Sequence, residues 1–198
     1  FKGNKRILLF LIEEGIMKID NHIISIIKQP EYNQKHYFEY FLPEITNFKM
    51  NKDQIKVGEK FNKKRKTGEN DNIICSLIRN DSIEDFIIYI TKNNISLVSV
   101  IEESIFETNS FLLMKKDITL IEYAAFFGSI QIFQYLKLNN VELKSSLWTY
   151  TIHGQNADLI HLLEENNVNP PMKNYGIYLV EAIKCHFNNL FIYILDKY

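Results

Sequence analysis

Four side chains that often bind zinc lie in the last third of the chain, namely His153, His161, Cys185 and His186. They show neither the C-x-x-C nor the H-x-x-x-H spacing that clusters zinc ligands. A nucleophilic role for Cys75 or Cys185 needs an adjacent base and a cleft. His186 follows Cys185 directly, but neighbouring residues on a helix point in different directions. We therefore expect no metal, no cofactor and no catalytic residue, and so no enzyme.

The basic run Lys63-Lys64-Arg65-Lys66 is the other stretch that could bind a ligand. Such runs can be nuclear-localisation signals or nucleic-acid patches, although a solvated linker is the more common reading. Nucleic-acid binding needs aromatic stacking partners or a groove, and only Phe61 is nearby. The glycines are scattered singly, so there is no phosphate-binding loop. With a net charge of −1 as well, we expect neither nucleic acid nor a small-molecule substrate as the partner.

The size and composition are typical of one large domain or a short repeat array. The chain has 198 residues, and its hydrophobic content of 46% suffices for a packed core. The longest apolar run, Ile7 to Ile12, is far short of the roughly 18 residues of a membrane helix, and no leader is visible. Cys75 and Cys185 lie in apolar helical patterns, which suits reduced thiols in the cytoplasm. Because the chain begins with Phe1 rather than Met, we expect a segment of a longer protein.

The stretch from Ile118 to Val141 predicts two short antiparallel helices, over Leu120–Phe127 and Ile130–Leu138, joined by a turn at Gly128. Asn139-Asn140 should end the second helix, because Asn readily takes the left-handed conformation after a helix. Four apolar positions of the second helix recur elsewhere at the same spacing. The sets are Ile132, Phe133, Tyr135, Leu136; Leu159, Ile160, Leu162, Leu163; Leu190, Phe191, Tyr193, Ile194; Phe86, Ile87, Tyr89, Ile90; and Ile7, Leu8, Phe10, Leu11.

Four of these copies share a stop, in which a turn residue is followed by an aliphatic residue. The stops are Glu14-Gly15-Ile16, Asn93-Asn94-Ile95, Asn139-Asn140-Val141 and Asn166-Asn167-Val168. The corresponding first helices are expected over 23–27, 73–78, 120–127, 147–153 and 178–185. Small or short residues align in three of them at Ala124, Thr151 and Ala182, where they would allow close approach of neighbouring helices. A lone helix pair cannot bury its apolar face, so the pairs must stack.

Some segments interrupt this period and define the expected organisation. Residues 1–45 should hold helix pairs, with an aromatic helix over Lys35–Leu42 that ends at Pro43. Residues 46–72 read as a basic linker or exposed helix, because the stretch from Lys49 to Lys66 carries eight Lys and Arg against Asp53 and Glu59. Residues 73–198 should form the main array, with an insertion at 96–116 that packs through its apolar residues.

The stretch Thr119-Leu120-Ile121-Glu122-Tyr123-Ala124-Ala125, followed by Gly128, resembles the ankyrin repeat signature T-P-L-H-x-A-A. The resemblance implies an all-α, ankyrin-like helix-turn-helix solenoid of about four to five irregular repeats. Leu120 stands in place of the usual Pro and Glu122 in place of the usual His, which normally ties adjacent turns together by hydrogen bonds. Packing of the apolar face is therefore expected to hold the stack together. Trp148 stands at a small core position of the repeat and should be a packing wedge.

The run from Lys64 to Asp71, with the segments Ile74–Ile78 and Asp81–Ile87, is similar to an uncharacterised ankyrin-like family expanded in trichomonad protists. This resemblance covers most of the chain from Asn4 to Leu195. It implies an ankyrin-type solenoid and no known catalytic residues.

The family resemblance also implies where a partner would bind, namely the turn tips and the outward side of the first helices. The corresponding residues here are Asp117, Phe126, Phe127, His153 and Lys184. Two adjacent Phe on a helix cannot both face the same core, so one is expected to be an exposed anchor unless the insertion covers it.

The predicted function is a non-enzymatic protein–protein interaction scaffold or adaptor in the cytoplasm. The alternative is a structural subunit built into a large cytoskeletal, microtubule-associated assembly. This alternative is indicated by the apolar helices at both ends of the printed chain, which would need to be covered. The partner in either case is another protein.

Overall fold

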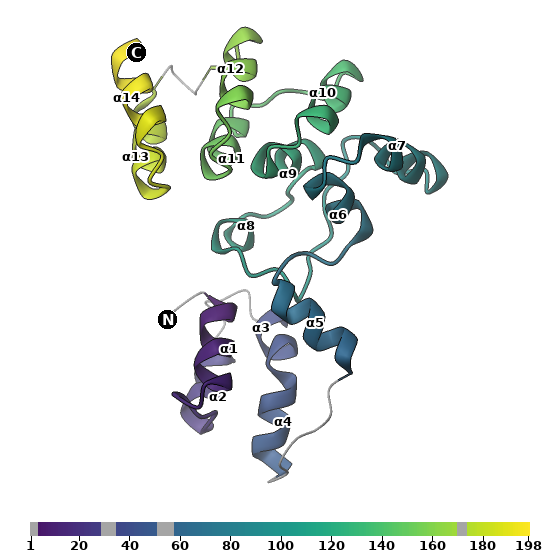
Figure 1. The fold of residues 1–198 in the computed structure, drawn as a ribbon, viewed down its shortest axis with the longest axis vertical. Helices are drawn as coiled ribbons and strands as arrows, with labels where there is room; N and C mark the ends of the chain where they lie inside the picture. Colours follow the sequence, from purple (N-terminus) through teal and green to yellow (C-terminus); the bar gives the residue numbers. More distant parts are fainter. Residues whose placement is uncertain (1–3, 29–34, 51–57, 170–173) are drawn as a thin grey trace. The chain divides into compact units, whose positions relative to one another are not determined.

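The computed structural model describes residues 4–28, 35–50, 58–169 and 174–198. Within these ranges the chain forms fourteen helices and one isolated β-bridge, which confirms the predicted all-α class (Figure 1). The helices are α1 (Lys5–Glu13), α2 (Asn21–Ile27), α3 (Lys35–Tyr40), α4 (Leu42–Met50), α5 (Glu59–Thr67), α6 (Ile73–Arg79), α7 (Ile83–Lys92), α8 (Ser110–Met114), α9 (Leu120–Phe127), α10 (Ile130–Leu138), α11 (Leu147–His153), α12 (Ala157–Glu165), α13 (Gly176–Lys184) and α14 (Asn188–Lys197).

The chain divides into two compact units. Unit 1 consists of Phe1–Asn72 and Glu102–Lys116, and unit 2 of Ile73–Ile101 and Asp117–Tyr198. The predicted insertion at 96–116 is therefore shared between the units. It packs as expected, because Phe106, Phe111 and Leu112 are all buried. Among the described residues, no helix combines the length and apolar character that crossing a bilayer requires.

Unit 1 has its own apolar core, formed by α1 to α4. Its buried residues are Leu9, Ile24, Ile27, Tyr40, Phe41 and Ile45. The prediction that Pro43 ends an aromatic helix was wrong. The helix α3 ends at Tyr40, and Pro43 lies in the first turn of α4, where its missing N–H costs no helical hydrogen bond.

Two buried cations connect the parts of unit 1. The ammonium of Lys5 is fully buried and donates to the carbonyl oxygens of Ile105 and Glu107, each at 3.0 Å. Burial lowers the pKa of Lys5 to about 8, against the opposing charge of Glu107. The Arg65 guanidinium, 3% exposed, donates to both carboxylate oxygens of Glu44, at 2.7 and 3.2 Å. These contacts attach α1 to the 102–116 segment and α5 to α4.

Unit 2 is a succession of helix pairs, α6–α7, α9–α10, α11–α12 and α13–α14. The first helices of successive pairs pack against one another, α6 on α9, α9 on α11 and α11 on α13 (Figure 1). The side chains predicted to allow this approach, Ala124, Thr151 and Ala182, are all fully buried. Gly154 allows the same approach, because a Cβ atom there would lie 2.1 Å from the carbonyl oxygen of Phe126.

The predicted helix stops are confirmed in the backbone. Asn94, Asn140 and Asn167 have φ angles of 50°, 62° and 55°, in the left-handed region. In each case the amide of the following residue donates to the carbonyl oxygen five residues earlier. Val141 donates to Leu136 at 3.1 Å, and Val168 donates to Leu163 at 2.9 Å. This is the Schellman arrangement, in which the residue after the left-handed one also makes an apolar contact with the helix. It explains why an aliphatic residue follows each Asn pair.

Trp148 is the centre of the contact between α11–α12 and α13–α14. It is fully buried, and its Nε1–H donates to the carbonyl oxygen of Val168 at 2.6 Å. Its ring stacks on Tyr178, with 5.2 Å between centroids and 9° between planes. Since the indole N–H has a protein acceptor, the packing wedge predicted at this position is confirmed.

Raising the pH above 10 should destabilise unit 2. The Tyr178 hydroxyl is buried and donates to the carbonyl oxygen of Ser145 at 2.9 Å, and burial raises the pKa of Tyr178 to about 12. The neutral phenol stabilises the fold below pH 10, and this contribution is lost as the pH rises toward 12, up to about 2–3 kcal/mol. Urea unfolding followed by Trp148 fluorescence at pH 9 and pH 11 measures the loss. Tyr178→Phe should reduce this loss, and an equal loss in that variant would refute the assignment.

Candidate protein-binding surface

The turn before α9 exposes Asp117 at a tip of unit 2. The segment Ser99–Ile101 pairs with Ile118–Leu120 through two backbone hydrogen bonds. The Ile101 amide donates to the carbonyl oxygen of Ile118 at 2.7 Å, and the Leu120 amide donates to that of Ser99 at 3.2 Å. This pairing includes the isolated bridge between Val100 and Thr119. Asp117 has a φ of 53° at this corner, and its side chain is exposed. Asp tolerates such a backbone because its short side chain can bond locally.

Glu122 connects this turn to the next one. One oxygen of its carboxylate accepts from the Thr119 amide at 3.0 Å and from the Thr119 hydroxyl at 2.8 Å, which completes a capping box. The other oxygen accepts from the hydroxyl of Ser146, in the next turn, at 2.8 Å. The prediction that Glu122 lacks the chemistry to connect adjacent turns was therefore wrong. It failed because it treated Glu122 only as a lost His, although a carboxylate can accept from both turns at once.

Glu122→Ala should destabilise unit 2 by about 1–3 kcal/mol, because it removes the cap of α9 and leaves Ser146 without this acceptor. The free energy of unfolding from urea titration, read by Trp148 fluorescence, measures the change. Glu142→Ala is the matched control, since Glu142 is 78% exposed and lies 3.8 Å from Lys144 in an open ion pair. Equal free energies for the two variants would refute the connecting role.

Between these two turns lies a hollow of about 240 Å³, here called the tip groove. It is lined by Val98, Asp117, Thr119, Ile121, Glu122, Val141, Glu142, Lys144, Ser146 and Leu147. Val98 is 64% exposed at the groove, and Asp117, Glu142 and Lys144 bring both signs of charge to it. The groove thus offers apolar contact beside groups that can pair with charges or amides.

The two adjacent Phe differ in accessibility. Phe126 is 9% exposed and belongs to the core of unit 2, because α6, α10 and α11 all pack on α9. Phe127 is half-buried, with its ring 4.7 Å from that of Tyr123 and 5.9 Å from the guanidinium carbon of Arg79. Only Phe127 keeps a partly accessible ring as a contact for a partner. Phe126 is removed from the set of contact residues for this physical reason.

His153 and Lys184 are brought together by Glu181. His153 Nε2 lies 2.9 Å from one oxygen of the Glu181 carboxylate, and Lys184 Nζ donates to the other at 2.7 Å. Burial raises the pKa of Glu181, but hydrogen bonds from Lys184 and His153 outweigh it and hold this pKa below its usual value. Asp117 and Phe127 are not part of this cluster. Asp117 lies before the first residue of α9, and Phe127 is the last residue of α9.

Cys75, Cys185 and His161 contact other groups of unit 2 and form no common site. Cys75 is fully buried, and burial together with the charge of Glu181 raises the pKa of the Cys185 thiol despite Lys184 nearby. The ring of His161 meets Tyr193 edge-on with 5.6 Å between centroids. In the part of the chain that the structure describes, no three His, Cys, Asp or Glu side chains are grouped to hold a metal ion.

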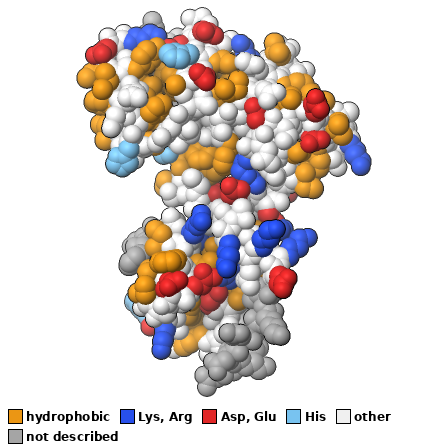
Figure 2. All heavy atoms as spheres, viewed as in Figure 1, with side chains coloured by type: hydrophobic (Ala, Val, Ile, Leu, Met, Phe, Trp, Pro, Cys, Tyr) orange, Lys and Arg blue, Asp and Glu red, His pale blue; other side chains and the backbone are white. Residues whose placement is uncertain are grey.

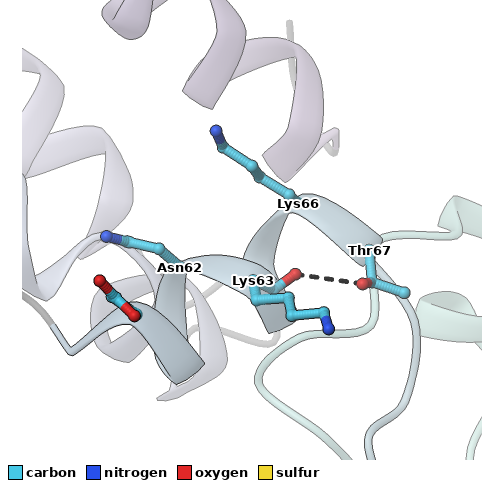
Figure 3. A pocket seen from close by; sticks show the side chains of 5 residues that line it. Asn62, Lys63, Lys66 and Thr67 are labelled. Atoms are coloured by element: carbon cyan, nitrogen blue, oxygen red, sulfur yellow. Dashed lines mark hydrogen bonds between the residues drawn. The ribbon is translucent and has the colours of Figure 1, made fainter.

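The basic run Lys63–Lys66 lies on α5, and two of its four residues form ion pairs within unit 1. Arg65 is buried against Glu44, and Lys64 Nζ is 2.5 Å from the Asp71 carboxylate. Lys63 and Lys66 are exposed and line an open hollow with Glu59, Asn62 and Thr67. Figure 3 shows the Lys63 and Lys66 side chains pointing away from each other, so these two ammonium groups do not converge on one ligand.

No family model, curated protein or solved structure matches the chain closely enough to establish a relationship. The resemblance to ankyrin repeats therefore stays a prediction. The function of this surface must therefore be inferred from the side chains that form it. They form a small groove of mixed character, one partly accessible aromatic ring and a hydrogen-bonded charge cluster.

Proposed function

We propose that the chain is a non-enzymatic protein-interaction scaffold in the cytoplasm, built from about four to five irregular ankyrin-like helix pairs. Support for the ankyrin type comes from the stacked first helices, the Schellman stops and the connection of adjacent turns by Glu122. Arrays of this kind bind partners because their exposed tips vary while the packed helices keep them in place.

The tip groove is the observation that carries the proposal. Its volume of about 240 Å³ is below the roughly 300–1,000 Å³ of small-molecule sites, so it suits one or two side chains of a protein loop. Val98 offers apolar contact, while Asp117 and Lys144 can bind amides or opposite charges. Glu122 and Ser146 are already hydrogen-bonded to each other, which lowers the ordering cost of binding.

Cross-linking capture from the cells that make the protein tests this proposal. The bait is the whole chain, compared with Val98→Asp, which places a charge in the groove, and with Asp117→Lys. The matched control is Ile88→Asp on α7, since Ile88 is 63% exposed and Val98 64%. We expect the control to retain a specific set of proteins that both groove variants lose. Equal capture by all four chains would refute the tip groove as the binding site.

A second candidate is a structural subunit of a cytoskeletal, microtubule-associated assembly. The observation that favours it is the row of exposed apolar side chains on α13 and α14 (Figure 2). A permanent subunit should sediment with detergent-resistant cytoskeleton, whereas a scaffold should leave a freely soluble pool. Cell fractionation with an antibody to the chain separates the two candidates.

A further inference from the structure

The tip groove has an uneven charge. Of the described residues that line it, Asp117, Glu122 and Glu142 carry carboxylates, and Lys144 carries an ammonium group. Three negative charges against one positive charge give the lining a net charge of −2 at neutral pH, whereas the whole chain carries only −1. Because opposite charges attract across an interface, the groove favours a cationic group over an anionic one.

Contacts within unit 2 leave the negative charges of the groove in place. The Glu122 carboxylate accepts from the Thr119 amide and from the hydroxyls of Thr119 and Ser146, and all of these donors are neutral. Glu142 and Lys144 lie 3.8 Å apart with 78% and 65% of their side chains exposed. Water screens such an open pair, and little energy is needed to separate it. The Glu142 carboxylate is therefore available to a cation from outside the chain.

The backbone holds Asp117 in place beside the groove. Its φ of 53° lies in the left-handed region, and the residues that follow it pair with Ser99–Ile101 through two backbone hydrogen bonds. Lys115 and Lys116 precede it in the chain but are not among the described residues that line the groove. An exposed carboxylate on a fixed turn loses little freedom when it binds a cation, which lowers the entropic cost of the contact.

The apolar lining of the groove selects the kind of cation. Val98 is 64% exposed, and the buried side chains of Ile121, Val141 and Leu147 also line the hollow. A long basic side chain lays its methylene groups along such a surface while its charged end reaches a carboxylate. The volume of about 240 Å³ suits one side chain of this length. Of the two long basic side chains, Arg is enriched at protein interfaces and Lys is depleted, and a guanidinium is more weakly hydrated than an ammonium group.

We infer that the tip groove binds an arginine side chain from a loop of the partner protein. The inference rests on the function proposed above, because it needs the groove to be a protein-binding site. The guanidinium pairs with Asp117 and Glu142, and its aliphatic stem packs on Val98. Lys144 opposes the bound cation, so substitutions of the acidic and basic lining residues should change the affinity in opposite directions.

Nuclear magnetic resonance of the whole isotope-labelled chain tests the inference with three short peptides as probes. The peptides are acetyl-Val-Arg-Val-amide, its citrulline counterpart, which has nearly the same shape without the charge, and acetyl-Val-Glu-Val-amide. The arginine peptide should shift the amide signals of Val98, Asp117 and Lys144. The citrulline peptide should bind about 2- to 5-fold more weakly, the usual effect of one exposed ion pair. The glutamate peptide should leave these signals unchanged.

Two substitutions of the groove separate its charges. Asp117→Asn should weaken binding of the arginine peptide about 2- to 5-fold, since Asn also tolerates the left-handed backbone and only the charge is lost. Lys144→Gln should strengthen it by a similar factor, because the opposing charge is removed. Glu165→Gln is the matched control, since it removes an exposed carboxylate at the end of α12, outside the groove, and should leave the affinity unchanged.

Three results would overturn the inference. The arginine peptide could leave the groove signals unchanged, it could bind no better than the citrulline peptide, or the glutamate peptide could bind in its place, which would assign the groove to an acidic partner. The capture experiment with Asp117→Lys tests the proposed function separately. Loss of captured proteins in that variant, without binding of the arginine peptide, would keep the groove as a protein-binding site and refute only the arginine.

Discussion

Arg65→Ala is expected to destabilise unit 1 by about 3–5 kcal/mol, because it leaves the partner of a buried ion pair without its counter-charge. Both terminal nitrogens of Arg65 bind the Glu44 carboxylate, which is only 20% exposed. The guanidinium also lies 5.2 Å from the ring centre of Tyr40 and 5.7 Å from that of Phe61. The substitution therefore removes an ion pair and the packing between α5 and the core at once.

Hydrogen exchange measured by mass spectrometry reads this change directly in unit 1. The amides of α4 and α5 should exchange far faster in Arg65→Ala, while those of α9 to α12 keep their rates. Lys63→Ala is the control, since Lys63 is an exposed cation on the same helix and should change unfolding by less than about 0.5 kcal/mol. If Arg65→Ala behaves like this control, the buried pair does not stabilise unit 1.

Trp148→Ala is expected to cost unit 2 about 3–5 kcal/mol, the usual range for removing a fully buried Trp. It leaves a cavity between α11 and α13, removes the stacked partner of Tyr178 and leaves the Val168 carbonyl without its donor. The loss should appear in urea unfolding followed by far-ultraviolet circular dichroism, because the variant has no Trp fluorescence.

Trp148→Phe separates packing from the hydrogen bond. It keeps an aromatic ring against Tyr178 and loses only the Nε1–H donor and part of the volume, so a smaller loss of about 1–3 kcal/mol is expected. If the alanine and phenylalanine variants lose the same free energy, the ring stack contributes nothing. If neither loses more than about 1 kcal/mol, the wedge role itself is refuted.

The helices of unit 2 could be predicted closely because their limits are marked locally. The observed bounds of α9, α10 and α11 are those expected from the repeat around Gly128 and Asn140. A left-handed residue followed by an aliphatic one specifies a helix end within a few residues, whatever the rest of the chain does. The bounds in unit 1 were predicted less well, since Pro43 fits both the end of one helix and the first turn of the next.

The candidate surface could be predicted only in part. Sequence reasoning selected Asp117 and Phe127, which keep accessible side chains, and His153 and Lys184, which turn out to share Glu181. It gave no sign of the tip groove, because Val98 and Lys144 come from segments that precede α9 and α11 and meet only in the folded chain. It expected one of Phe126 and Phe127 to be exposed but could not say which, and the packing of three helices on α9 buries Phe126.

By itself, the sequence determined that this protein is a series of short helix pairs, where those pairs end and which small residues lie between them. These properties depend on backbone conformation and on spacing within a few residues. Only the tertiary structure decided which charged side chains are buried and which groups they bind. Arg65 in a basic run is buried, and Glu122 accepts hydrogen bonds from two successive turns. The burial and hydrogen bonding of a side chain depend on contacts between residues far apart in the chain, as for Lys5 and Glu107.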